Sequence, residues 1–157
     1  MRWHYRDPPL VWLLVGAYAA HVAEEAPGFV GWTRRHGSRE YGRSDFALIN
    51  GAGLALTLAA TRLVSRRPTR PIVFLYFAHV LTQQAVFNAA FHLGTTIAYR
   101  EYSPGVLTAT LAFPALWWRL TRLARSEGLL SRAGAVGAAA IGGAVHAKAV
   151  ASQVYGR

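Results

Sequence analysis

The side chains of this chain that are best suited to chemistry lie close together near its start. The segment His21-Val-Ala-Glu24-Glu25 places one imidazole and two carboxylates within five residues. On a helix, positions i, i+3 and i+4 share one face, so these three side chains are predicted to converge. The surrounding residues are apolar, and ionisable groups in such a segment are costly, which makes them candidates for a functional site.

A second polar series interrupts a long apolar segment in the middle of the chain. Gln84, Asn88 and His92 follow one another at four-residue spacing, which predicts one polar stripe on a helix face. Asn50 lies near the start of another apolar segment. If successive helices alternate in direction, the His21–Glu25 motif falls at the same depth of a helical bundle as Asn50, Asn88, His92 and Tyr102. His146, in the last apolar segment, falls there too, although a simple interhelical hydrogen bond accounts for it more readily.

A divalent metal is the simplest ligand for this set, because imidazole and carboxylate suit zinc, iron or manganese. A catalytic zinc needs about three protein ligands and one open position. We expect zinc or iron to be bound by His21, His92 and either Glu24 or Glu25. A glutamate that is not a ligand is predicted to act as general base on bound water. The alternative for the first motif is an internal ion pair, or a position at the membrane interface.

Other polar residues are expected to assist this site. Asn88 is predicted to orient the substrate or a ligand, and the Tyr102 hydroxyl to reach the reacting atoms, although anchoring at the interface is commoner for tyrosine. Further substrate-binding candidates are Asn50, Gln84, Arg34 and Arg35. The two arginines belong to a basic stretch that is suited to headgroup contact or to an anionic lipid.

The composition explains where such a site must lie. Of 157 residues, 53% are hydrophobic and only 15% are charged, yet the formal net charge is +10. The apolar content excludes a disordered chain, and the low charged fraction argues against a soluble nucleic-acid binder. A membrane protein with basic loops satisfies both figures. The chain has no cysteine, which excludes disulfides and thiolate metal sites.

About five apolar segments approach the roughly 20 residues needed to cross a bilayer. They span residues 10–27, 46–64, 71–99, 104–124 and 129–154, and Pro114 is predicted to kink the fourth. The expected fold is an all-α integral membrane bundle, with residues 1–157 as a single polytopic domain. The fifth segment is rich in Ala and Gly, so a four-helix core with a peripheral fifth helix is the alternative.

The distribution of basic residues predicts the orientation. Ten fall on the side of the N-terminus and seven on the other, which favours a cytoplasmic N-terminus. The expected partners are the lipid bilayer and a hydrophobic small-molecule substrate, without nucleic acid. Assembly into a homo-oligomer stays open.

Three motifs resemble one family. His21-Val-Ala-Glu24-Glu25, then Asn88-Ala-Ala-Phe-His92, then Tyr102-Ser103-Pro104-Gly105 are similar to the HXXEE-domain family of small bacterial membrane proteins. The match spans the first to the fourth segment, about two-thirds of the chain. The resemblance implies a bacterial inner membrane as the location and these three motifs as the site, and it does not imply a particular reaction.

Four functions remain open at the level of sequence. The first is a metal-dependent membrane enzyme that hydrolyses a hydrophobic or lipid-like substrate with metal-activated water. The second is a metal-free cyclase or isomerase of an isoprenoid or polyene, in which Glu24 and Glu25 transfer a proton. The third is a small proton-coupled or ion-coupled transporter. The fourth is a structural membrane subunit.

Overall fold

The computed structural model describes residues 8–38 and 40–154, and every regular element in them is helical. This confirms the all-α helical bundle expected from the sequence. The helices are α1 (Pro8–Glu25), α2 (Phe29–His36), α3 (Arg43–Arg66), α4 (Arg70–Tyr76), η2 (Phe77–Leu81), η3 (Gln83–Asn88), α5 (Ala89–Tyr99), α6 (Val106–Leu111), α7 (Phe113–Ser126) and α8 (Arg132–Gln153). Four arginines of the charge count, Arg2, Arg6, Arg39 and Arg157, lie outside the described residues.

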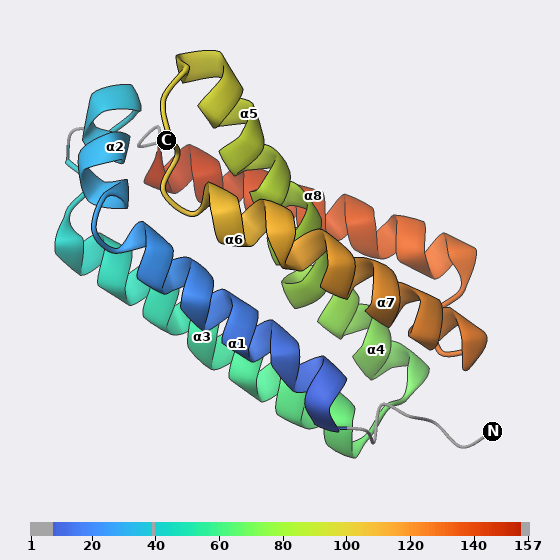
Figure 1. The fold of residues 1–157 in the computed structure, drawn as a ribbon. Helices are drawn as coiled ribbons and strands as arrows, with labels where there is room; N and C mark the ends of the chain where they lie inside the picture. The colour runs from blue at the N-terminus through green and yellow to red at the C-terminus, as the bar shows by residue number, and fades with distance from the viewer. Residues whose placement is uncertain (1–7, 39, 155–157) are drawn as a thin grey trace.

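The long helices run in alternating directions along one bundle. In Figure 1, α1 and α3 lie side by side, and the continuous helix from α4 to α5 crosses beside α6, α7 and α8. The end of α1, the start of α3, the end of α5 and the start of α6 therefore gather at one end, near α2. The α7–α8 turn lies at the opposite end. This alternation gives the common depth that the site residues require.

The helix from Arg70 to Tyr99 is widened in its middle. Residues Phe77–Leu81 and Gln83–Asn88 form two π-helical stretches, joined at Thr82. In a π-helix the hydrogen bonds span five residues instead of four. Such stretches are rare in proteins, but those that occur often lie at functional sites. Here they precede His92 and contain Gln84 and Asn88, so the polar stripe of the sequence lies on and just beyond the widened segment.

Local sequence explains several helix ends. Ser131 begins α8, and its Oγ accepts a hydrogen bond of 2.9 Å from the Gly134 backbone N–H. Gly105 begins α6 at a φ of 102°, a conformation in which glycine has no steric penalty. The predicted kink takes another form, because the chain turns at Ala112 and Pro114 lies in the first turn of α7. Proline suits that position, since its missing N–H would be unpaired there in any residue.

Two apolar cores hold the bundle together. The larger joins α1, the long central helix, α6, α7 and α8, and its largest fully buried side chains include Leu14, Phe77 and Phe113. The smaller packs Phe29 and Trp32 of α2 against the loop before α3 and the end of α8. The sequence predicts no helix at 29–36, because that stretch is short and carries Arg34 and Arg35. Its apolar face, however, closes the site end of the bundle.

Three helices are long and apolar enough to cross a membrane by length and composition. They are Arg43–Arg66, Arg70–Tyr99 and Arg132–Ser152, which correspond to the second, third and fifth predicted segments. Only 17% of the apolar window of α3 and 11% of that of α8 is buried inside the protein, so both helices direct apolar side chains outward. Such large exposed apolar surfaces indicate membrane association. The helix α8 packs along the long central helix.

Candidate metal centre and its pocket

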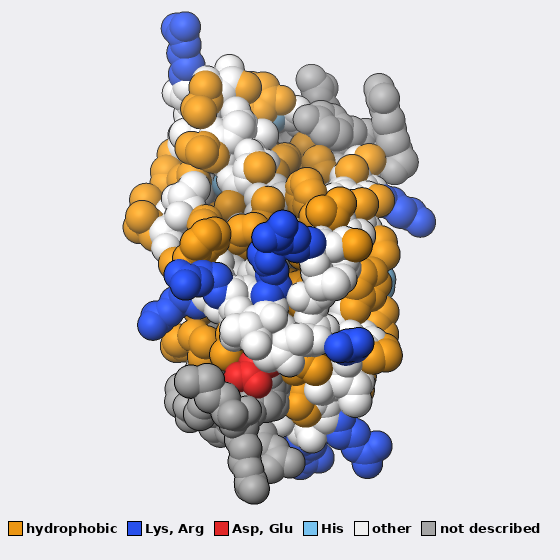
Figure 2. Space-filling view, turned by 90° about the vertical axis from the view of Figure 1, so that its right-hand side faces the viewer, with side chains coloured by type: hydrophobic (Ala, Val, Ile, Leu, Met, Phe, Trp, Pro, Cys, Tyr) orange, Lys and Arg blue, Asp and Glu red, His pale blue; other side chains and the backbone are white. Residues whose placement is uncertain are grey.

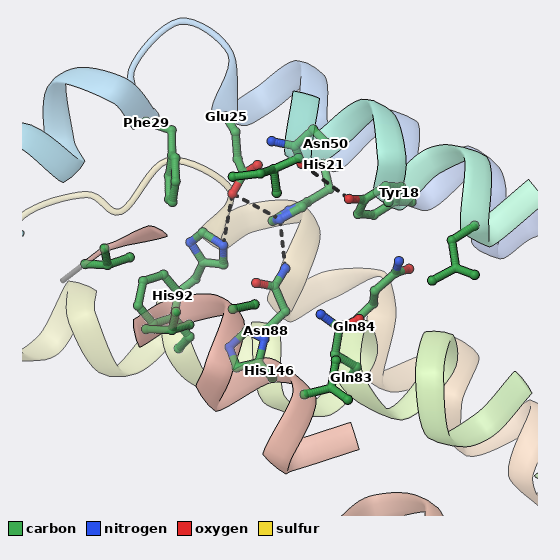
Figure 3. Close-up of a pocket in the computed structure, with 18 of the residues that line it drawn as sticks. Tyr18, His21, Glu25, Phe29, Asn50, Gln83, Gln84, Asn88, His92 and His146 are labelled. Carbon is green, nitrogen blue, oxygen red and sulfur yellow. Dashed lines mark hydrogen bonds and ion pairs between the residues drawn. The ribbon is translucent and has the colours of Figure 1, made fainter. Parts of the chain in front are cut away.

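His21, Glu25 and His92 form a buried cluster at the site end of the bundle. One donor atom from each lies within 4.8 Å of the other two, and the residues are 1%, 5% and 0% exposed. Glu25 Oε1 is 3.4 Å from His21 Nε2 and 3.3 Å from His92 Nε2 (Figure 3). Helix α1 supplies the first two residues at i and i+4, and α5 supplies the third. This group could hold a metal ion.

Hydroxyl groups fix the orientation of both imidazoles. His92 Nδ1 is 2.9 Å from Ser103 Oγ, and His21 Nδ1 is 2.8 Å from Thr108 Oγ1. Both rings therefore turn Nε2 towards Glu25. Metal-binding histidines commonly have this arrangement, in which the second nitrogen is held by a hydrogen bond and the first faces the ion.

The protonation pattern at His21 follows from Asn88. Asn88 Nδ2 donates to His21 Nε2 at 2.8 Å, so Nε2 presents a lone pair. His21 Nδ1 then carries the proton and donates it to Thr108 Oγ1, whose own hydroxyl donates to the Gly105 carbonyl. An unprotonated Nε2 is the form of the imidazole that binds a metal ion, and an ion bound there would take the place of the Asn88 hydrogen bond because the nitrogen has a single lone pair.

His92 leads to the same conclusion by a different route. Its Nε2 is buried and has no hydrogen-bond partner among the described residues. Its distance of 3.3 Å from Glu25 Oε1 exceeds the roughly 2.7–2.9 Å of a charge-assisted hydrogen bond. Buried polar atoms are rarely left unpaired, and such an atom in a group of potential ligands is suited to binding a metal ion.

The separations fit metal coordination. A tetrahedral zinc with bonds of about 2.0–2.1 Å to nitrogen and oxygen holds neighbouring ligand atoms about 3.4 Å apart. The two distances from Glu25 Oε1 to the imidazoles are 3.4 and 3.3 Å. Aromatic rings surround the cluster, with Phe113 centred 5.4 Å from His21 and Phe91 centred 5.1 Å from His92. This apolar surrounding strengthens electrostatic attraction for a cation.

Glu24 lies outside this cluster. Its two carboxylate oxygens accept hydrogen bonds from the backbone N–H groups of Leu107, at 2.9 Å, and Thr108, at 2.8 Å. These are unpaired donors in the first turn of α6, so Glu24 caps that helix from outside. The structure thus places Glu24 at the start of α6 and not in the cluster, where the sequence predicts a ligand or a general base. An i, i+3 spacing puts Cβ atoms on one side of a helix but does not fix where longer side chains end.

Tyr102 lies beside Glu24, outside the cluster. Its side chain is half exposed, and its hydroxyl donates to Glu24 Oε1. Partial burial and this bond to a carboxylate raise the pKa of Tyr102 to about 12. The hydroxyl thus supports the cap of α6, and it does not line the pocket beside the cluster.

A cavity of about 260 Å³ adjoins the cluster. Asn50 and Asn88 line it, as expected from their predicted depth, together with Gln84, Tyr18 and His146 (Figure 3). The Tyr18 hydroxyl donates to Asn50 Oδ1 at 3.3 Å, and Gln84 Nε2 donates to Thr57 Oγ1 at 2.9 Å. Two further polar atoms, Gln84 Oε1 and His146 Nε2, are buried without a partner among the described residues.

The predicted arginines do not reach this cavity. Arg34 Nε donates to the Tyr41 carbonyl at 2.8 Å, and Arg35 pairs with Glu101 on the surface. His36 also contacts Glu101, at 2.7 Å. The hydrogen bond from His36, followed by that from Arg35, lowers the pKa of the Glu101 carboxyl. Both arginines tie α2 to nearby loops, and neither is among the residues that line the cavity.

Comparison with known proteins identifies a family for this chain. A family model described as a protein of unknown function with HXXEE motif matches residues 12–119. This chain belongs to the HXXEE family. The match confirms the resemblance seen in the sequence, and it contains every residue of the cluster and both hydroxyl partners. No curated protein and no solved structure matches the chain.

The three ionisable residues of the HXXEE motif have different positions in the structure. Its histidine and its last glutamate belong to the cluster, and its first glutamate caps α6. The sequence did not single out Ser103 and Thr108, although Ser103 stands inside the third motif. His146 lies beyond the matched residues, yet it lines the cavity from α8.

Proposed function

We propose that this chain is an integral membrane enzyme that binds a divalent metal, zinc or iron, at His21, Glu25 and His92. It hydrolyses a hydrophobic or lipid-like substrate. The observation that carries the proposal is the cluster of two Nε2 atoms and one carboxylate oxygen beside a cavity. Two histidines and one glutamate are an established ligand set for catalytic zinc, with a fourth position left for water.

A bound metal would lower the pKa of a coordinated water towards neutrality. The protein residues supply the rest. Ser103 and Thr108 hold the imidazoles in the tautomer that presents Nε2. Asn88 Nδ2, now 2.8 Å from His21 Nε2, lies where it could donate to the oxygen of a substrate. The apolar rings around the cluster limit the access of bulk water.

The position of the cavity supports a hydrophobic substrate. Its walls include Ile49 and Leu56 of α3 and Val145 and Ala149 of α8, which are outward-facing, membrane-length helices. Leu56 is 51% exposed at the edge of the cavity. A substrate dissolved in the hydrocarbon could therefore enter sideways, between α3 and α8, without crossing into water.

Metal content is the direct test. The full chain, purified in mild detergent and exposed to zinc, iron or manganese, is expected to hold about one ion. Variants His21→Ala, Glu25→Gln and His92→Ala should hold much less. His79→Ala is the matched control, because His79 is exposed on the same long helix and is not part of the cluster. A wild-type protein that takes up none of these metals would refute the proposal.

Activity is the second arm. Wild type is expected to cleave a fluorogenic long-chain acyl ester in mixed micelles. Cleavage should stop when a chelator removes the metal and resume when the metal is restored. Cleavage that persists without metal would instead favour acid–base chemistry at Glu25. Flux of protons through liposomes, absent in Glu25→Gln, would favour a transporter.

The membrane topology belongs to the same proposal. We infer that α1 and the α6–α7 pair cross beside the three membrane-length helices, with the N-terminus in the cytoplasm of a bacterial cell. Because the chain has no cysteine, single labels can be introduced freely. An impermeant maleimide should label Glu40→Cys from outside the cell and Glu127→Cys only after permeabilisation. The reverse pattern would invert the topology.

A further inference from the structure

A second site lies at the other end of the bundle, between α7 and the first half of α8. The surface there holds a groove of about 760 Å³. Its lining includes Trp118, Arg122, Arg125, Arg132, Val136 and Ala139. We propose that this groove binds one anionic phospholipid, with the phosphate at the arginines and an acyl chain along the apolar part.

The two walls of the groove change from basic to apolar in the same direction. On α8, Arg132 stands at the start of the helix and Ala139 lies seven residues, or about 10 Å, further in. On α7, which runs the opposite way, Arg125 is near the end and Trp118 lies the same distance further in. The groove is therefore basic at the end of the bundle and apolar towards its middle, which is the polarity of a lipid lying along a membrane protein.

The three arginines are available to an anion. Arg122, Arg125 and Arg132 are exposed, and within the described part of the chain none of them forms an ion pair. Arg122 lies 5.8 Å from the ring centre of Trp118, a cation–π contact that holds its guanidinium over the groove. Guanidinium groups bind phosphate through two parallel hydrogen bonds, which suits them to a lipid headgroup.

The apolar part has the features of a hydrocarbon contact. Trp118 is 57% exposed and Val136 is 71% exposed, so the groove presents large apolar side chains outward. Between the two parts, Thr121 Oγ1 is buried and has no hydrogen-bond partner among the described residues. It is at the level where a lipid carries its ester carbonyl groups.

Figure 2 looks at this end of the molecule. Basic side chains surround apolar surface there, and the acidic surface in this view is one small area. An anionic leaflet attracts such a surface, and each basic residue close to it contributes a factor of about five in binding. This inference rests on the proposed membrane insertion but not on the metal or on the enzyme activity.

The test is lipid binding by the full chain, measured by native mass spectrometry in detergent. Wild type is expected to bind one dioleoylphosphatidylglycerol more tightly than one dioleoylphosphatidylcholine. In Arg125→Gln/Arg132→Gln, binding of the anionic lipid should weaken about 25-fold. The matched control is Arg66→Gln/Arg67→Gln, which removes the same charge at the α3–α4 turn and should change binding less than twofold.

A second variant probes the apolar part. Ala139→Trp fills the groove without a change in charge and should also weaken binding of the anionic lipid. Glycerol 1-phosphate at the concentration of the lipid should not compete, because it lacks the acyl chains. Equal binding of the two lipids, equal loss in the two double variants, or displacement by glycerol 1-phosphate would each overturn the proposal. Metal content should be unchanged in all of these variants, so failure here leaves the proposed enzyme untouched.

Discussion

Glu24 and Glu25 are adjacent in the chain, but their carboxylates serve different parts of the structure. Glu24 accepts hydrogen bonds from the backbone N–H groups of Leu107 and Thr108, whereas Glu25 faces the imidazoles of His21 and His92. The turn of the helix between them separates a capping role from a candidate ligand role. A matched pair of substitutions can therefore distinguish the two.

Glu24→Gln is expected to destabilise the protein and to leave metal uptake intact. The change removes the negative charge and one acceptor oxygen from the first turn of α6, which should cost about 1–2 kcal/mol. Glu25→Gln should show the opposite result, with little loss of stability and strongly reduced metal content. Thermal unfolding by circular dichroism and elemental analysis of the same samples check both. A Glu24→Gln protein that is fully folded but holds no metal would contradict the assignment of Glu24 to the cap and Glu25 to the metal.

Gly105 is predicted to be irreplaceable for a steric reason. A Cβ atom there would lie 2.6 Å from His21 Cε1 and 2.9 Å from His92 Cε1, and the residue has a φ of 102°. Gly105→Ala should therefore force both imidazoles apart and reduce metal binding at least tenfold. Gly128→Ala is the control, because Gly128 also has a positive φ, of 68°, but open space around it. It should cost about 1 kcal/mol of stability and no metal.

The hydroxyl partners of the histidines should tune metal affinity. Ser103→Ala and Thr108→Val each remove the hydrogen bond that orients one Nδ1. Loss of such partners typically reduces metal affinity 10-fold to 100-fold. Thr110→Val serves as the control, since Thr110 Oγ1 bonds to the Val106 carbonyl of its own helix. Competition titration with a chromophoric chelator measures the affinities. An equal effect in all three variants would assign the loss to helix α6 and not to the imidazoles.

The stability of the protein should depend on pH through Glu101, which contacts Arg35 and His36 on the surface. Its folded-state pKa is lowered by His36 and Arg35, so its contribution to stability is present above the unfolded pKa and is lost as pH falls through the folded pKa. Glu101→Gln should therefore lower the melting temperature slightly at pH 7. The difference from wild type should vanish in acid below both pKa values. Because the carboxyl is exposed, high salt should also reduce the difference. A difference that grows in acid would contradict this sign.

The sequence predicts the end of the bundle at which the site lies better than it predicts which side chains enter the cluster. Alternation of apolar segments was enough to bring His21, Asn50, Asn88 and His92 to one end of a bundle, because helix direction reverses at every turn. Periodicity also located the long helices within a few residues of their ends. These features follow from the pattern of apolar residues, which is a property of the chain itself.

The direction of individual side chains could not be predicted in the same way. Whether Glu24 or Glu25 faces the cluster depends on where α6 begins, and that depends on the turn at Gly105. The role of Ser103 depends on the same turn. Helix α2 was missed because it is short and basic, and only its packing of Phe29 and Trp32 against the rest of the bundle explains it. Such features depend on tertiary contacts that a single sequence does not display.

The widened stretches of the central helix leave the chain a freedom in length that composition alone would not suggest. A π-helical stretch accommodates residues that an α-helix of the same length has no room for. Each widened stretch holds one residue more than an α-helix of the same rotation would, so deleting one residue between Phe77 and Asn88 should let that stretch close into an ordinary α-helix. The helix on either side would keep its phase, and His92 would still face Glu25. Deleting Ala90 from α5 would instead turn His92 by about 100° about the helix axis, because an α-helical turn has no extra residue to lose. The widened segment is thus the part of the long helix where the chain can lose a residue without turning His92 away from Glu25.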